Sequence, residues 1–183
     1  MTKILSASFP TKGKPMTISM YQASAPVLER MLVNLVAILE KGAAHAAAKK
    51  IEPSVFINAR LSPDMFTFAK QIQIAADMAK GCMARLAGDE PPKYEDNETT
   101  FAELIARIEK TIAYIKSFTP AQIDGNEDRH IVLPMRSGPL GFKGQPYLLH
   151  WVYPNFYFHV TTAYDILRHN GVEVGKMDFL GKP

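Results

Sequence analysis

Apolar residues recur at helical spacing along most of this chain. From Thr17 to about Lys50 they follow one another at intervals of three and four positions, the spacing of one helix face. The alanine-rich stretch after Gly42 either extends this helix or begins a short second one. Pro26 either kinks the helix or opens it at its first turn, with Ser24 as a cap.

A second helix is predicted after a connector that is bracketed by Pro53 and Pro63. We expect it to start after Ser62, with Pro63 at the first helical position, because proline is tolerated there. Its apolar face runs to about Leu86, and Gly88 ends it.

A third helix follows a polar loop that contains two prolines. Thr99 or Thr100 caps it, and Glu103 stands three residues after Thr100, which matches a capping box. An isoleucine-rich stripe continues to Phe118, and the segment 119–124 indicates one more short helical turn.

The pattern then changes to β-branched runs around a Ser-Gly turn, which predicts a small hairpin near 129–134 and 139–143. The fourth long helix is expected from about Pro146 to His169, with Gly171 in its stop signal. The C-terminal tail shows no helical periodicity.

The predicted fold is therefore all-α: a four-helix bundle with at least one crossover connection and a small β-hairpin before the last helix. The 183 residues suit one domain, and 47% apolar content is enough for a core. We expect residues 1–15 to form an N-terminal extension and residues 16–183 to form the bundle domain.

Charge and cysteine content narrow the function classes. The net charge of +3 is spread along the chain, so we expect no nucleic-acid partner. No continuous apolar run reaches the roughly 18 residues of a membrane span, so we expect no membrane partner. The single cysteine, Cys82, permits no intramolecular disulfide and fits a reducing cytoplasm.

Candidate chemistry is densest on the fourth helix. Asn155 and His159 lie four residues apart and share a helix face. Pro154 removes a backbone donor and frees the carbonyl of His150, so a local opening is expected there. His159 is a candidate catalytic proton donor or acceptor. The alternative is a hydrogen-bonded histidine in the core.

The second helix carries a polar stripe of Gln73, Asp77 and Lys80, with Gln71 on the other flank. One interpretation is a solvated edge with an Asp77–Lys80 pair. The other is a polar wall that faces the fourth helix across a pocket, in which Gln73, Asp77 and Asn155 bind a ligand.

The chain resembles the domain of unknown function 1993 family, which looks like a branch of the DinB-like superfamily of four-helix bundles. The resemblance covers about residues 16–182 and rests on five segments: MTISMYQAS, LSPDMF, QIQIAADMAKG, LAGDEPPKYEDNETTFAEL and PNFYFHVTTAYDILRHNGVEVGKMDFLG. It implies a homodimer, since many of these bundles dimerise.

The resemblance also implies a divalent-metal site. Relatives hold the metal with one histidine of the second helix and a His-x-x-x-His pair of the last. Here the pair matches Asn155 and His159, and the second-helix position matches Gln73, or Gln71 if the alignment slips. Only His159 keeps an imidazole, and zinc or nickel bind amides poorly.

Three hypotheses follow. The first is a small-molecule-binding protein or degenerate enzyme with a pocket of Gln73, Asp77, Asn155 and His159. The second is a metal-dependent thiol transferase or isomerase with an altered ligand set. The third is a non-catalytic, dimeric structural or stress-associated protein, in which Asn155 and His159 are buried with backbone partners.

Overall fold

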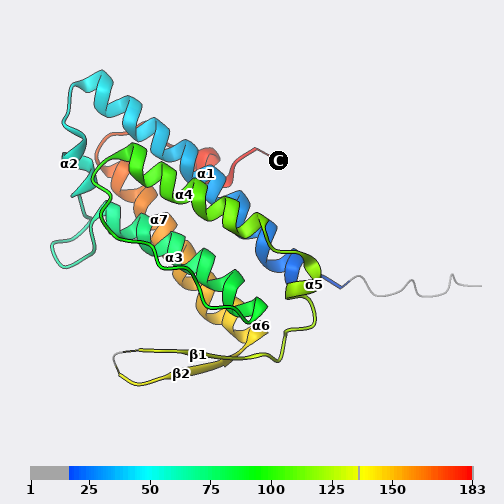
Figure 1. Ribbon diagram of the computed structural model, residues 1–183. Helices are drawn as coiled ribbons and strands as arrows, with labels where there is room; N and C mark the ends of the chain where they lie inside the picture. The colour runs from blue at the N-terminus through cyan, green and yellow to red at the C-terminus, as the bar shows by residue number, and fades with distance from the viewer. Residues whose placement is uncertain (1–16, 136, 183) are drawn as a thin grey trace, which may run out of the picture.

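Four long helices form a bundle, as predicted. The computed structural model describes residues 17–135 and 137–182, so the predicted extension 1–15 lies outside the described residues. Helix α4 packs between α1 and α3, and α7 packs on the other side of α3 (Figure 1). The long helices are α1 (Met20–Lys49), α3 (Phe68–Ala87), α4 (Phe101–Lys116) and α7 (Tyr153–His169).

The predicted crossover is confirmed. Helices α3 and α4 run in the same direction, opposite to α1 and α7 (Figure 1). The connection 88–100 must therefore return along the length of the bundle before α4 can begin. We call this connection the crossover segment.

The shorter elements complete the bundle at its ends. The hairpin forms where it was predicted, with Ile131 paired to Phe142 in antiparallel register. Ile131 and Leu133 are buried, so one strand face packs on the helices. The remaining elements are α2 (Pro53–Ile57), α5 (Pro120–Ile123), β1 (His130–Leu133), β2 (Leu140–Lys143), α6 (Gly144–Pro146), the π-helical η1 (Tyr147–Val152) and α8 (Lys176–Leu180).

Ser19, not Ser24, caps α1. Ser19 and Gln22 form a reciprocal capping box, and the Ser24 hydroxyl instead donates to the Met20 carbonyl inside the helix. The helix therefore starts before Pro26, which it contains, and the alanine-rich stretch extends it to Lys49.

Helix α3 starts later than predicted. Thr67 caps it by accepting from the backbone N–H of Lys70, whereas Pro63 lies in the preceding turn. The Thr100–Glu103 capping box of α4 is confirmed. Helix α8 was missed, because five residues are too few to show a periodic pattern.

The predicted last helix divides into α6, η1 and α7 without a break. At the end of η1 the Tyr153 N–H donates to the Leu148 carbonyl, five residues back. In a regular α-helix the ring of a proline clashes with the backbone carbonyl one turn before it. The wider π-helical turn displaces that carbonyl. The opening expected at Pro154 therefore takes the form of a π-helical turn just before it.

Helix α1 has an 18-residue window with the hydropathy of a membrane span, which core helices of globular proteins also show. Its apolar stripe packs in the core: Leu28, Leu32, Leu35 and Leu39 are fully buried. The thiol of Cys82 is buried in the same core.

Candidate functional site

His159 of α7 pairs with Gln71 of α3 in the bundle interior. The His159 Nδ1 atom lies 2.6 Å from Gln71 Oε1. Gln71 is 1% exposed and His159 is 9% exposed. The α3 residue that bonds the histidine is therefore Gln71, which the resemblance matched only if the alignment slips. Gln73 bonds Glu98 instead.

The hydrogen bonds of Gln71 determine which nitrogen of His159 carries the proton. Gln71 Nε2 donates to the Phe66 carbonyl at 3.2 Å, so its Oε1 faces the imidazole. An amide oxygen only accepts, and His159 Nδ1 must therefore donate. Burial lowers the pKa of His159, so the ring is neutral at pH 7 and its Nε2 carries a lone pair.

The lone pair of His159 Nε2 is available to a ligand. This nitrogen has no hydrogen-bond partner among residues 17–135 and 137–182, and 9% of the His159 surface is exposed. The Phe158 ring stands perpendicular to the imidazole at 5.3 Å, and Phe158 is itself half exposed. A neutral histidine with one oriented N–H and one accessible lone pair is suited to accept a proton or a hydrogen bond.

Asn155 turns its amide back to its own helix. Its Nδ2 donates to the Trp151 carbonyl at 2.6 Å. That carbonyl belongs to η1, where the regular helical hydrogen bonds are shifted. Asn155 thus has the backbone partner that the third hypothesis anticipated, whereas the partner of His159 is a side chain.

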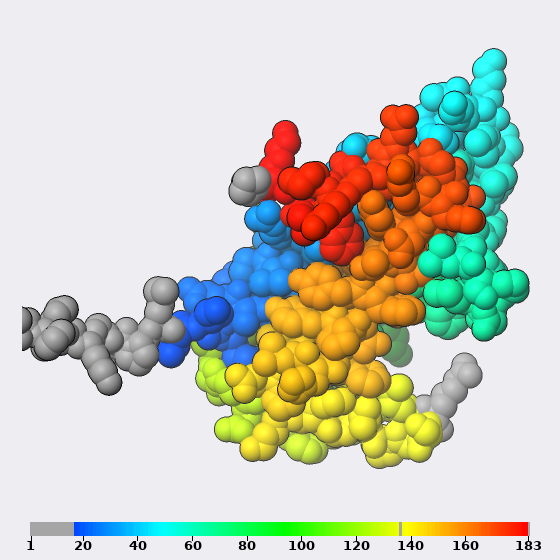
Figure 2. Space-filling model, turned by 180° about the vertical axis from the view of Figure 1, so that it is seen from behind, coloured from blue at the N-terminus to red at the C-terminus, as the bar shows by residue number. Residues whose placement is uncertain are grey.

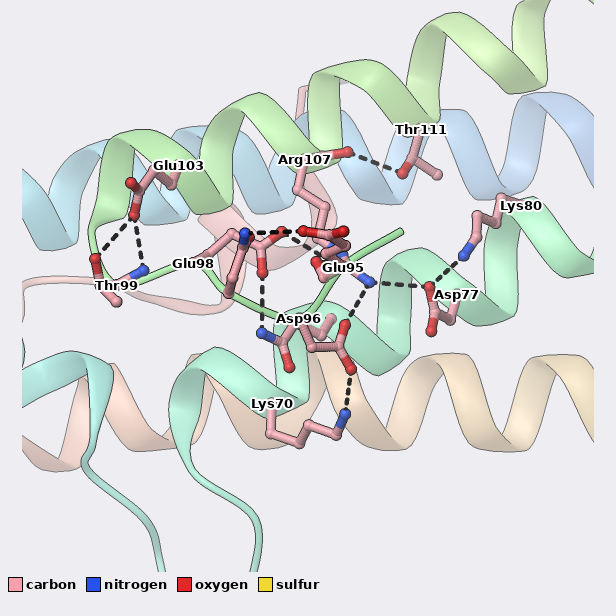
Figure 3. A network of polar contacts seen from close by, with 12 residues as sticks. Lys70, Asp77, Lys80, Glu95, Asp96, Glu98, Thr99, Glu103, Arg107 and Thr111 are labelled. Atoms are coloured by element: carbon pink, nitrogen blue, oxygen red, sulfur yellow. Dashed lines mark hydrogen bonds and ion pairs between the residues drawn. The ribbon is translucent and has the colours of Figure 1, made fainter. Parts of the chain in front are cut away.

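Gln73 and Asp77 belong to a different cluster, which is built around Arg107 of α4 (Figure 3). Arg107 donates to Asp77 at 3.0 Å and to Glu98 at 2.8 Å, and Gln73 donates to Glu98 at 2.9 Å. Asp77 also accepts from the buried Lys80. The four predicted site residues therefore make their hydrogen bonds in three separate places.

The Arg107 cluster fastens the crossover segment to α3 and α4. Arg107 also bonds Asp96 and the Glu95 carbonyl, and the ring of Tyr94 lies under the ammonium of Lys80 at 4.2 Å. Arg107 Nε is buried without a partner among the described residues. Since carboxylates neutralise the guanidinium, the cluster has the character of a structural ion-pair network.

Sequence reasoning missed Arg107, although a signal exists. Leu104, Ile108 and Thr111 are fully buried, and Arg107 stands among them at helical spacing. A charged residue within an apolar stripe requires partners from another segment. The acidic residues of the crossover segment supply them.

The surface hollows that we find lie away from His159. Five of those formed by the described residues have volumes of about 330 to 680 Å³, and His159 lines none of the five. Ligand contact with His159 would therefore take place outside these five hollows. The predicted pocket of Gln73, Asp77, Asn155 and His159 is not among these hollows.

The residues present fit a divalent metal poorly. Gln71 Oε1 already bonds His159, and the Asn155 amide already bonds its own helix. Within residues 17–135 and 137–182, no three His, Cys, Asp or Glu side chains are grouped as ligands would be. One imidazole beside two engaged amides is a weak donor set for zinc or nickel.

Comparisons with known proteins agree with this architecture. A family model described as Domain of unknown function (DUF1993) matches residues 20–180. The crystal structure of a DinB family member protein from Shewanella denitrificans is 43% identical, with a TM-score of 0.83. The match covers 89% of this chain and 92% of that one. No curated protein matches the chain.

Proposed function

Because the chain belongs to the DUF1993 family and has the fold of a DinB family member, we propose a small-molecule-binding protein or degenerate enzyme in which His159 contacts the ligand. The hydrogen bond between His159 Nδ1 and Gln71 Oε1 carries this proposal. It orients the ring and leaves the basic Nε2 as the nitrogen without a partner among the described residues. The resemblance implies that relatives with a metal hold it through histidines of these two helices, at the His159 position and at the Gln73 or Gln71 position.

In this proposal His159 accepts a proton or a hydrogen bond from a polar ligand. Gln71 takes the orienting role that we had expected of Gln73, and it stabilises the imidazolium that forms when Nε2 is protonated. Asn155 lies one turn away and is available to a ligand only if it leaves the Trp151 carbonyl. Asp77 and Gln73 would act through the crossover segment rather than by ligand contact.

A location in the cytoplasm and a homodimeric state belong to the proposal as well. The first is supported by the single buried cysteine, and the second by the resemblance to dimeric bundles.

The test is a fragment screen that observes the histidine nitrogens by NMR. We expect small phenols and imides, which offer an acidic O–H or N–H, to shift the Nε2 resonance of His159. The His159→Gln variant should lose this binding, and the matched His169→Gln variant, altered at an exposed histidine, should keep it. Fragment binding that survives His159→Gln would contradict the proposal.

Metal analysis separates the proposal from a metal-dependent transferase. We expect no stoichiometric zinc, nickel or manganese after purification under metal-replete conditions. Stoichiometric metal that is lost in His159→Ala would favour the transferase instead.

A second candidate is a non-catalytic structural protein, favoured by the Asn155–Trp151 bond and by the position of the five hollows. It predicts that a His159→Leu, Gln71→Leu double variant is as stable as the wild type, because a buried polar pair is exchanged for an apolar one. It also predicts that no fragment shifts His159.

A further inference from the structure

A hollow of about 680 Å³ lies between α1, α7 and α8, and it shares no residue with the His159–Gln71 pair. Figure 2 shows the face where α8, in red, lies against α1, in blue, beside α7, in orange. Val27, Arg30 and Met31 line it from α1, Tyr157 from α7, and Met177 and Leu180 from α8. We call it the Arg30 groove.

The walls of the Arg30 groove are mostly apolar. Met177 and Leu180 are 67% and 44% exposed, so both present apolar surface at the groove. The volume falls within the range of small-molecule sites, which are largely apolar with a few placed polar groups. An apolar ligand body would cover these side chains.

Arg30 is the charged group of the groove, and no carboxylate within residues 17–135 and 137–182 neutralises its charge. Its Nη2 donates to the carbonyls of Leu180 and Lys182, at 3.2 and 2.9 Å. The N–H groups of Nε and Nη1 have no partner among the described residues, and no described carboxylate forms an ion pair with Arg30. This is the opposite of Arg107, which carboxylates surround.

Tyr157 adds a second donor. Its hydroxyl has no hydrogen-bond partner within residues 17–135 and 137–182, and burial raises the pKa of the phenol, so the proton is retained. The Arg30 guanidinium and the Tyr157 phenol therefore each keep at least one N–H or O–H donor that has no acceptor among the described residues. Their chemistry complements a carboxylate.

We propose that the Arg30 groove binds an amphiphilic carboxylate, a small molecule with an apolar body and one carboxylate group. The carboxylate accepts from Arg30 and Tyr157, and the apolar body lies against Val27, Met31 and Leu180. This site is independent of the function proposed for His159.

Binding of decanoate and decanol tests the proposal, because the two probes share a chain and differ in charge. We expect saturable decanoate binding by isothermal titration calorimetry. Arg30→Gln, which keeps a donor for the C-terminal carbonyls, should weaken decanoate about tenfold, the loss of one charge-assisted contact. Its effect on decanol should stay within about twofold.

Two further variants complete the design. Arg60→Gln is the matched control, because Arg60 is also exposed and also donates to a backbone carbonyl. We expect it to leave decanoate affinity unchanged. Val27→Trp should fill the groove and weaken both probes.

The proposal is wrong if decanoate shows no saturable binding, or if the wild type and Arg30→Gln bind decanoate with equal affinity. It is also wrong if Arg30→Gln and Arg60→Gln lose equal decanoate affinity, or if Val27→Trp binds decanoate as tightly as the wild type. Decanoate affinity that falls as protein concentration rises would assign the groove to a second copy of the chain instead. His159→Gln should leave decanoate binding intact, so this site and the His159 site fail independently.

Discussion

Arg107 and His159 are both buried polar side chains, yet their surroundings give them opposite properties. Arg107 keeps its charge because Asp77, Asp96 and Glu98 surround it. His159 has one neutral partner and no ion pair among the described residues, so burial favours its uncharged form. The ion pairs of Arg107 fasten the crossover segment, whereas the neutral His159 remains available as a base.

Replacement of Arg107 should therefore destabilise the protein strongly. The Arg107→Met variant leaves Glu98, which is nearly buried, without its cation, and we expect a loss of about 3 kcal/mol in the free energy of unfolding. Urea unfolding measures it. Lys143→Met removes the exposed pair with Asp128 and should cost less than about 0.5 kcal/mol. Equal losses in the two variants would mean that the Arg107 cluster is not structural.

The pH dependence of stability should report the state of His159. Its folded pKa is lowered, so the unfolded chain takes up the proton first as pH falls below about 6.5. Stability should therefore decrease from pH 7 toward the folded pKa, by at most about 1.4 kcal/mol per pH unit. Urea midpoints between pH 5 and 8 should slope less in His159→Gln than in the wild type. Identical slopes would contradict the assigned neutral form.

At the scale of elements, the joint between the hairpin and the last helix has little room. A Cβ on Gly144 would lie 2.1 Å from the Asn126 carbonyl oxygen, so the backbone would have to move. We expect Gly144→Ala to cost about 1 to 3 kcal/mol by overpacking. Gly175→Ala is the control, since a Cβ there meets nothing within 4 Å. Thermal unfolding of both variants measures the difference.

The sequence predicts elements well where one stretch of chain contains the whole signal. The Thr100–Glu103 box and the periodic stripe of α4 are local, and both appear in the structure. The local sequence does not decide that α3 starts at Phe68, because Pro63 and Thr67 are each acceptable near a helix start. The choice between them depends on packing against other helices.

The candidate site is harder to predict, since it depends on which face of α3 meets α7. Gln71 and Gln73 differ by two positions, which places them on nearly opposite sides of a helix. Periodicity alone did not decide between them. The structure pairs Gln71 with His159 and Gln73 with Glu98. The acidic partners of Arg107 lie in a loop, where no periodic pattern indicates contacts.

At the scale of the whole molecule, the buried residues of all four long helices form one connected core. The hairpin end joins it through Trp151, whose ring lies 5.6 Å from that of Phe142. We expect the fluorescence of this single tryptophan and the far-UV circular dichroism to show coincident urea transitions. Separate midpoints would mean that the hairpin end unfolds as its own unit.

The burial of Cys82 has a practical consequence for measuring opening of the fold. The thiol is fully buried, and burial raises its pKa, so a thiol-reactive dye should modify only molecules whose core has opened. At dye concentrations where labelling outpaces reclosing, mass spectrometry of the single labelled site yields the opening rate in water, without denaturant. The Cys82 thiol thus reports rare opening of the native core without an added probe site. Arg107→Met should accelerate its labelling.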